Sequence, residues 1–198
     1  MLIVDIETSG TNPLKHSIIS LGAFDLRDPQ RHFSDLCRIW DGAHIMDEAL
    51  NYNGFHETEI TDQTKQSEGQ LIERFLEWAM TSEDHTVAGQ NHHFDFNFIQ
   101  QACARSGLNF PLAKRLIDLH SICYFHMIRT GRVIPIEKGR SSLDSDKIMD
   151  YVGIPAEPKP HQALNGAKWE TEAFHRLFFD QPLFEEFSKY PVPWVDNI

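Results

Sequence analysis

The chain has 198 residues, with 18 Lys and Arg against 29 Asp and Glu, which gives a formal net charge of −11. The length fits one globular domain, and 41% hydrophobic residues supply a core that a disordered chain would lack. The acidic charge excludes a protein that holds long nucleic acid by charge alone, and no apolar stretch approaches the roughly 20 residues of a membrane span.

The cysteines and the N-terminus indicate the setting of the protein. Cys37, Cys103 and Cys123 are odd in number and far apart, which fits neither a disulfide framework nor a zinc-binding pattern. Residues 1–14 lack the features of a signal peptide. Both observations favour a reducing, cytoplasmic setting. No repeat or long linker divides the sequence, so we expect one domain over residues 1–198.

The first part of the chain predicts three strands in succession. They are expected at residues 2–7, 16–26 and 32–40. Turn-forming residues at 8–13 separate the first strand from the second. The short connections suggest an antiparallel meander.

Helices dominate the rest of the chain. In order, we expect a helix at 67–80, a short strand at 86–89, a helix from Phe94 that stops at Gly107, and helices at 118–129, 145–151 and 163–178. A tail rich in Phe and Pro, residues 178–198, is expected to pack against the body. Strands followed by helices and short strands predict an α/β domain.

Two carboxylates end the first predicted strand. Asp5 and Glu7 are two residues apart, so their side chains point to the same face, whereas the apolar residues at 2, 4 and 6 face the other way. Burying two neighbouring carboxylates requires positive compensation, which a divalent cation bound to oxygen ligands would provide. The alternative is a solvated strand end beside a turn, and the spacing alone does not decide between them.

Two further residues are weak candidates by themselves. Asp95 lies among aromatic residues at the start of a predicted helix, where an acid is also favoured by the helix dipole. His161 precedes the last predicted helix, but a surface loop histidine is an equally simple explanation in a chain with 11 histidines.

Three segments together resemble a known family. They are VDIETSGTNP at 4–13, NHHFDFNFI at 91–99 and PHQALNGAKWE at 160–170. In this order and at these separations they resemble the three motifs of the DnaQ-like (DEDDh-type) 3′–5′ exonucleases, over roughly residues 2–177. The resemblance implies an RNase H-like fold, an α/β domain whose mixed five-stranded sheet is flanked by helices.

The resemblance also implies a role for each matched residue. Asp5 and Glu7 match the acids of the first motif, and Asp95 matches the acid of the second. These three would bind Mg²⁺ or Mn²⁺, with two ions in the site. His161 matches the general base that takes a proton from the attacking water, and Glu7 would also reach the terminal 3′ hydroxyl. The implied reaction is hydrolysis of phosphodiester bonds from the 3′ end of single-stranded or short nucleic acid, releasing nucleoside 5′-monophosphates.

One position departs from the family pattern. The family has a fourth metal-binding aspartate five residues after the histidine, and here that position is Gly166. Asn165 would point about 100° away on a helix. Glu170 lies one turn beyond Gly166 on the same face, and helical side chains lean toward the N-terminus. Glu170 is therefore a candidate to reach back toward the metals.

Gly166 leaves three hypotheses open. Glu170 or a water replaces the lost ligand, or the site holds one metal firmly and works poorly, or the domain is a degenerate module that binds nucleic acid or a partner protein. We expect retained catalysis, because three acids and the histidine are present. A phosphatase or other hydrolase would need a different ligand spacing. A homodimer is expected only by analogy with relatives, and the sequence does not distinguish DNA from RNA.

Aromatic and basic residues are candidates for substrate contacts. Phe94, Phe96 and Phe98 flank the second motif and could stack on a base. Phe94 and Phe98, however, lie on the apolar stripe of the predicted helix, and we expect them in the core. Residues 112–147 contain seven basic and four acidic residues. This stretch could guide a phosphate backbone or form an ordinary solvated face, so we assign no individual substrate-binding residue.

Overall fold

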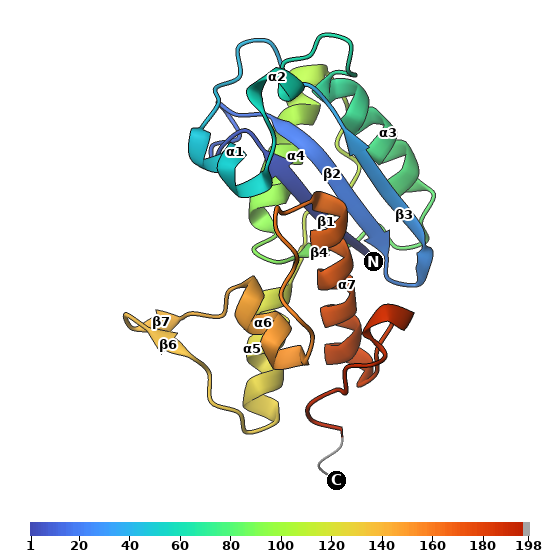
Figure 1. The fold of residues 1–198 in the computed structure, drawn as a ribbon. Helices are drawn as coiled ribbons and strands as arrows, with labels where there is room; N and C mark the ends of the chain where they lie inside the picture. The colour runs from blue at the N-terminus through green and yellow to red at the C-terminus, as the bar shows by residue number, and fades with distance from the viewer. Residues whose placement is uncertain (196–198) are drawn as a thin grey trace.

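Five strands form one mixed sheet in the computed structural model, which describes residues 1–195 (Figure 1). The strands are β1 (Leu2–Thr8), β2 (Ile18–Asp25), β3 (Asp28–Leu36), β4 (Val87–Gly89) and β5 (Ile117–Asp118). The order is β3-β2-β1-β4-β5, with β1 antiparallel to β2 and parallel to β4. This arrangement confirms the predicted antiparallel meander and the predicted mixed five-stranded sheet.

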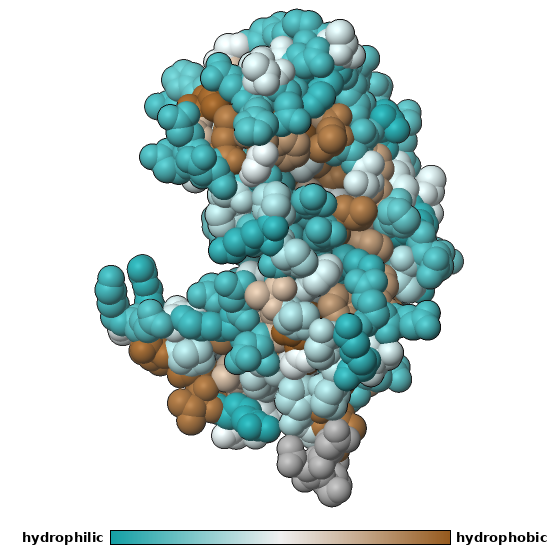
Figure 2. Space-filling view, viewed as in Figure 1, coloured by the Kyte–Doolittle hydropathy of each residue, from teal (hydrophilic) through white to brown (hydrophobic). Residues whose placement is uncertain are grey.

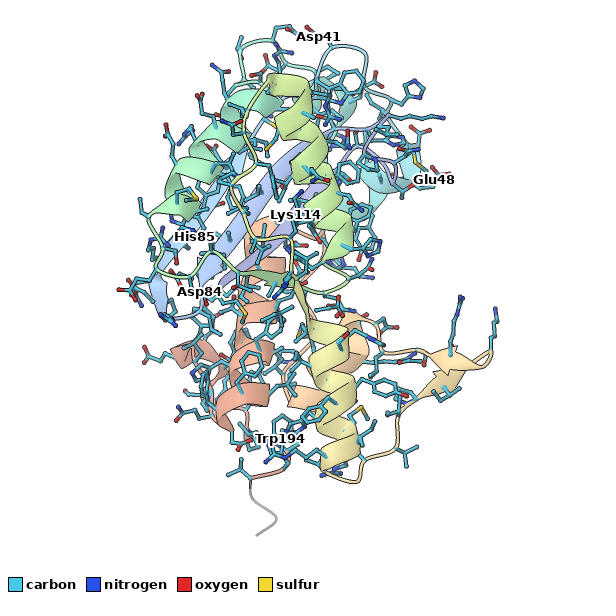
Figure 3. All side chains as sticks on the ribbon, turned by 180° about the vertical axis from the view of Figure 1, so that it is seen from behind. Asp41, Glu48, Asp84, His85, Lys114 and Trp194 are labelled. Carbon is cyan, nitrogen blue, oxygen red and sulfur yellow. The ribbon has the colours of Figure 1, made fainter. Side chains whose placement is uncertain are left out.

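Helices cover both faces of the sheet. They are α1 (Asp47–Asn53), α2 (Glu57–Ile60), α3 (Glu68–Met80), α4 (His93–Ser106), α5 (Leu119–Arg129), α6 (Ser145–Val152) and α7 (Ala163–Phe179). Helix α7 crosses one face, and α3 and α4 cover the other (Figures 1 and 3). Side-chain N-caps define several starts: Ser67 accepts from the Gln70 N–H, and Asp118 accepts from the Ser121 N–H.

Alternation along β1 divides the core in two. Leu2, Val4 and Ile6 pack with the buried residues of α3 and α4, as the pattern predicted. Ile3 faces the opposite way and packs with α5, α6 and α7. Since Asp5 has the parity of Ile3, its side chain points toward α7. This parity places the acids of β1 on the α7 face.

The third strand differs from its prediction. It spans Asp28–Leu36, not 32–40, because the hairpin turn is tight and Asp25 pairs with Asp28. Residues 38 and 39 leave the sheet, and their N–H groups bond to the carbonyls of Gln66 and Ile60. Several short elements were not predicted from the sequence: α1, α2, β5 and a two-stranded hairpin formed by β6 (Ile136–Glu137) and β7 (Arg140–Ser141).

After α7 the chain turns back along that helix, so that Phe187 packs against Trp169. A short 3-10 helix, Glu185–Phe187, brings Phe187 into the core, and Val192 is also buried. Residues 196–198 of the expected tail lie outside the described residues. Cys37, Cys103 and Cys123 are free and buried. Within residues 1–195, no helix has the length and apolar character needed to cross a membrane.

Candidate active site

The site lies where the start of α7 packs on the middle of the sheet. Asp5 on β1 pairs in register with Gly22 on β2. A Cβ at Gly22 would lie 2.3 Å from the backbone of Ala163, the first residue of α7. The missing side chain at Gly22 therefore lets α7 approach the sheet directly beside Asp5.

Gly166 makes a second close contact, this time with Asp5 itself. A Cβ at Gly166 would lie 2.2 Å from Oδ2 of Asp5, far inside van der Waals contact. The Asp5 carboxylate thus occupies the space that a side chain at 166 would need. The glycine that departs from the family pattern at position 166 is therefore the residue that the packing around Asp5 allows. An aspartate at this position would have to displace Asp5.

Glu170 lies beside the acids of β1 and α4. Its side chain is 6% exposed, and Oε2 accepts a hydrogen bond of 3.1 Å from the backbone N–H of Gln90. Burial and the nearby Asp95 carboxylate raise the pKa of Glu170 well above its usual range. Desolvation and then the charge of Glu170 raise the pKa of Asp5. Glu170 is therefore placed where the replacement hypothesis requires it, and its role as a ligand stays a prediction.

Asp95 enters the site where two parallel strands separate. The pairing of β1 with β4 ends at Ile3 and Ala88. Farther along β1, the Ile6 N–H donates to Oδ1 of Asp95 over 3.2 Å. Asp95 is 5% exposed in the first turn of α4, so the carboxylate fills the gap between the strands. This position accounts for its closeness to Asp5 and Glu170.

Glu7 connects the sheet to α1. Its side chain is 8% exposed and hydrogen-bonds to Asn53, which also donates to the carbonyl of Thr8 over 3.1 Å. Burial and then the charge of Glu157 raise the pKa of Glu7 to about 8. Asn53 thereby fixes the carboxylate at the rim of the acidic cluster.

His161 is held by two residues that the sequence analysis did not identify. Its Nδ1 lies 2.8 Å from Oε2 of Glu157, and its ring stacks on Tyr52 with 4.3 Å between centroids and an interplanar angle of 9°. A carboxylate accepts hydrogen bonds, so this contact favours the tautomer with the proton on Nδ1 and leaves Nε2 free to accept one. Glu157 lies four residues before His161 in a non-helical, proline-rich loop, where no periodicity could reveal it.

Five carboxylates therefore form one acidic cluster. They belong to Asp5, Glu7, Asp95, Glu157 and Glu170, and each lies close enough to another to raise a pKa. Among residues 1–195 no Lys or Arg forms an ion pair with any of them; the histidines at 92 and 161 are their nearest basic partners. Concentrated negative charge without a cation is unfavourable in a protein interior.

This donor set fits a hard divalent cation. All five groups offer carboxylate oxygens, the ligands that Mg²⁺ prefers, and Mg²⁺ commonly takes one or two of them and keeps several waters. In the described part of the chain, however, no three or more His, Cys, Asp and Glu side chains lie together in an arrangement that could hold a metal ion as they stand. A cation bound here would therefore take only one or two of these carboxylates and complete its coordination with water.

A cavity of about 350 Å³ adjoins Glu7. Its walls are largely apolar and include Met46, Ala49, Tyr52 and Phe94. The expectation that Phe94 is a core residue is therefore only partly correct, because it packs on the core and also lines this cavity. The same expectation for Phe98, which is 0% exposed, is confirmed.

Comparisons with known proteins identify the family and the fold. A sequence model of the exonuclease family matches residues 2–174, whereas no curated protein matches the sequence. The chain is similar to cell-death related nuclease 4 (CRN-4), with a TM-score of 0.70, 18% identity, and coverage of 89% of this chain and 62% of that one. The nuclease domain of 3′hExo, a DEDDh family member solved bound to rAMP, gives a TM-score of 0.69, 17% identity, and coverage of 90% and 91%.

A third similar structure is E. coli Exonuclease I in complex with a 5cy-dT13 oligonucleotide. It gives a TM-score of 0.70 at 16% identity, and the match covers 90% of this chain but 41% of that one. Likeness at such identities shows the fold, which is the predicted RNase H-like one. The chain spans 62% of CRN-4 and 41% of Exonuclease I, so their whole-protein activities are not carried over with the fold.

Proposed function

Because the chain belongs to the DnaQ-like exonuclease family, we propose that it is a metal-dependent 3′–5′ exonuclease acting on single-stranded or short nucleic acid. The observation that carries the proposal is the acidic cluster beside the Glu157–His161 pair. A cluster of carboxylates needs cations, and a histidine whose Nδ1 proton is held by a carboxylate is prepared to act as a base.

Different residues of the site would bind the metal ions, accept the proton and hold the terminal nucleoside. Asp5, Glu7 and Asp95 would hold two Mg²⁺ or Mn²⁺ ions, the number that the family resemblance implies. Glu170 would take the place of the carboxylate that Gly166 lacks. Bound cations would supply charge stabilisation at the phosphate and a water of lowered pKa. His161 would accept the proton of that water at Nε2, while Glu157 keeps the proton on Nδ1. The cavity beside Glu7 would take the terminal nucleoside, with Phe94 as its aromatic wall.

The direct test is hydrolysis of a 5′-labelled single strand, as DNA and as RNA, with Mg²⁺ or Mn²⁺. Stepwise shortening from the 3′ end, absent in Asp5→Asn and absent when the 3′ hydroxyl is blocked by phosphate, would support the proposal. Binding without shortening in either metal would contradict it and favour the non-catalytic module.

Replacing Glu157 by Gln is expected to lower kcat about 10- to 100-fold with little change in KM. The amide cannot hold the Nδ1 proton as a carboxylate does, so more of the ring adopts the unproductive tautomer. Steady-state kinetics on the labelled strand measure the effect. In a His161→Ala background the same change should have almost no further effect, because the two residues act as one unit. A changed metal requirement in Glu157→Gln would instead make Glu157 a ligand.

Adding Mg²⁺ or Mn²⁺ to protein freed of metal by EDTA is expected to raise the Tm by about 5 °C or more at a cation concentration about 100 times the Kd. The cation compensates the acidic cluster of the folded state. The rise should be larger at pH 8.5 than at pH 6, because the raised pKa of Glu7, about 8, means that the cation must displace a proton at the lower pH. Differential scanning fluorimetry measures both. An equal rise in Asp5→Asn would show that the cation binds elsewhere.

A further inference from the structure

A hairpin arm projects from the body between α5 and α6. The arm, defined as residues 130–142, contains β6 and β7 and stands clear of the helices in Figures 1 and 3. Lys138 and Gly139 form its two-residue turn, with φ angles of 52° and 78°. Two positive φ angles are those of a type I′ turn, in which Asn or Gly is usual and a lysine is strained. The chain thus places a cation at the tip at a conformational cost.

Two of the arginines that form no ion pair among the described residues belong to the arm. Six of the ten arginines form ion pairs, at positions 27, 31, 38, 74, 105 and 176. The four without an ion pair among the described residues are all exposed, at positions 115, 129, 132 and 140. Arg132 and Arg140 belong to the arm, together with the exposed Lys138. In a chain of net charge −11, this is a concentration of free positive charge.

The root of the arm lies next to the active site. Ser141, at the end of β7, bonds through its hydroxyl to Nε2 of His120 over 3.0 Å. His120 is in the first turn of α5, two residues after Asp118. Asp118 accepts from the His92 N–H, and its charge acts on Glu170. The arm therefore begins beside the acidic cluster and extends outward from it.

The surface between the arm and the active site is hollowed. Figure 2 shows this concavity between the arm and the part of the molecule that carries α1. Helix α1 contributes Tyr52 and Asn53, which contact His161 and Glu7. A strand that enters the hollow would meet the site at one side and the cations of the arm at the other.

We propose that the arm binds the phosphate backbone of a single-stranded nucleic acid whose 3′ end lies in the active site. The acidic cluster repels phosphates that are not bound through metal, so cations beside it are needed to hold the upstream strand. The inference rests on the proposed function and adds to it that the preferred substrate is a strand of several nucleotides. A dinucleotide would occupy the active site without reaching the tip of the arm.

Binding measurements test the proposed role of the arm without requiring catalysis. Fluorescence anisotropy would measure the affinity of full-length Asp5→Asn protein for 5′-labelled 12-nucleotide oligo(dT) and oligo(U). Adding Lys138→Gln and Arg140→Gln should raise Kd about 10-fold and reduce the slope of log K against log salt by about 1.4, since single strands lose about 0.7 per phosphate contact. A matched control, Arg27→Gln with Lys189→Gln, removes the same charge from the β2–β3 turn and the C-terminal segment and should change Kd less than about 2-fold.

Two results would overturn the proposal. One is an arm variant that binds the strand as tightly, and with the same salt slope, as its parent. The other is equal weakening by the control, which would make the effect one of net charge. Val133 and Ile136, which are 88% and 56% exposed, give the arm an apolar side. If the arm binds a protein partner through this side and not a nucleic-acid strand, the arm variant would bind the strand as tightly as its parent.

Kinetics separate this inference from the proposed function. In the otherwise unchanged enzyme, the arm substitutions should lower kcat/KM about 10-fold for the 12-nucleotide strand and leave that for a dinucleotide unchanged. Equal loss on both substrates would contradict a role in binding the upstream strand. If the unchanged protein hydrolyses neither substrate yet binds the strand through the arm, the proposed function fails and the arm proposal stands.

Discussion

Glu170→Gln is expected to lower metal-dependent hydrolysis at least about 100-fold, equivalent to about 2.7 kcal/mol of transition-state stabilisation. Glu170 is the carboxylate that α7 brings to Asp5 and Asp95, and a ligand that helps to hold a catalytic cation contributes several kcal/mol. The amide keeps the size of the side chain and an oxygen that accepts the Gln90 N–H. The loss is therefore expected in the rate and in the metal concentration required, with little loss of Tm, and a metal titration of the rate measures both.

Gly166→Asp tests whether Glu170 replaces the missing acid. Alone, the substitution should lower activity, because its Cβ would lie 2.2 Å from Oδ2 of Asp5. Combined with Glu170→Ala, which vacates space into which Asp5 can move, it should restore activity above that of either single variant. The four rates form a double-mutant cycle. If the losses of the two substitutions simply multiply, Glu170 does not replace the aspartate.

The parts of the site that follow from local periodicity could be predicted from sequence. Strand alternation places Asp5 and Glu7 on one face, and the structure adds that this face meets α7. Helical spacing likewise places Glu170 one turn from Gly166. These relations hold within a single element, so no knowledge of tertiary packing is needed.

Glu157 and Tyr52 show where such reasoning stops. Both contact His161, yet one lies in an irregular loop and the other is more than 100 residues away on a short helix that the sequence pattern did not predict. Gly166 is the intermediate case. From sequence it is an absent carboxylate, whereas in the structure it is a contact between α7 and Asp5. Such contacts depend on how separate elements pack, which the local pattern does not contain.

A buried ion pair lies between α7 and the C-terminal segment. Arg176 and Glu172 are both 0% exposed, and Nε of Arg176 lies 2.7 Å from Oε1 of Glu172. The other guanidinium nitrogens donate to four backbone carbonyls, those of Val152, Phe187, Tyr190 and Pro191. Glu172 in turn accepts from two N–H groups of residues 183 and 184. The pair therefore joins α7, the end of α6 and the C-terminal segment.

Arg176→Met is expected to destabilise the protein by about 3–5 kcal/mol, because it leaves the Glu172 charge buried without a partner and several carbonyls without donors. For a chain of this length, that lowers the Tm by about 10 °C, measurable by calorimetry or circular dichroism. Lys168→Met is the matched control, because it breaks an ion pair between the same helix and Glu186. The side chains of Lys168 and Glu186 are 25% and 50% exposed, so the loss of this pair should cost less than about 1 kcal/mol. Equal losses in the two variants would show that burial does not set the strength of the contact. A small loss for Arg176→Met alone would mean that the C-terminal segment contributes little to holding α7, and with it Glu170, against the sheet.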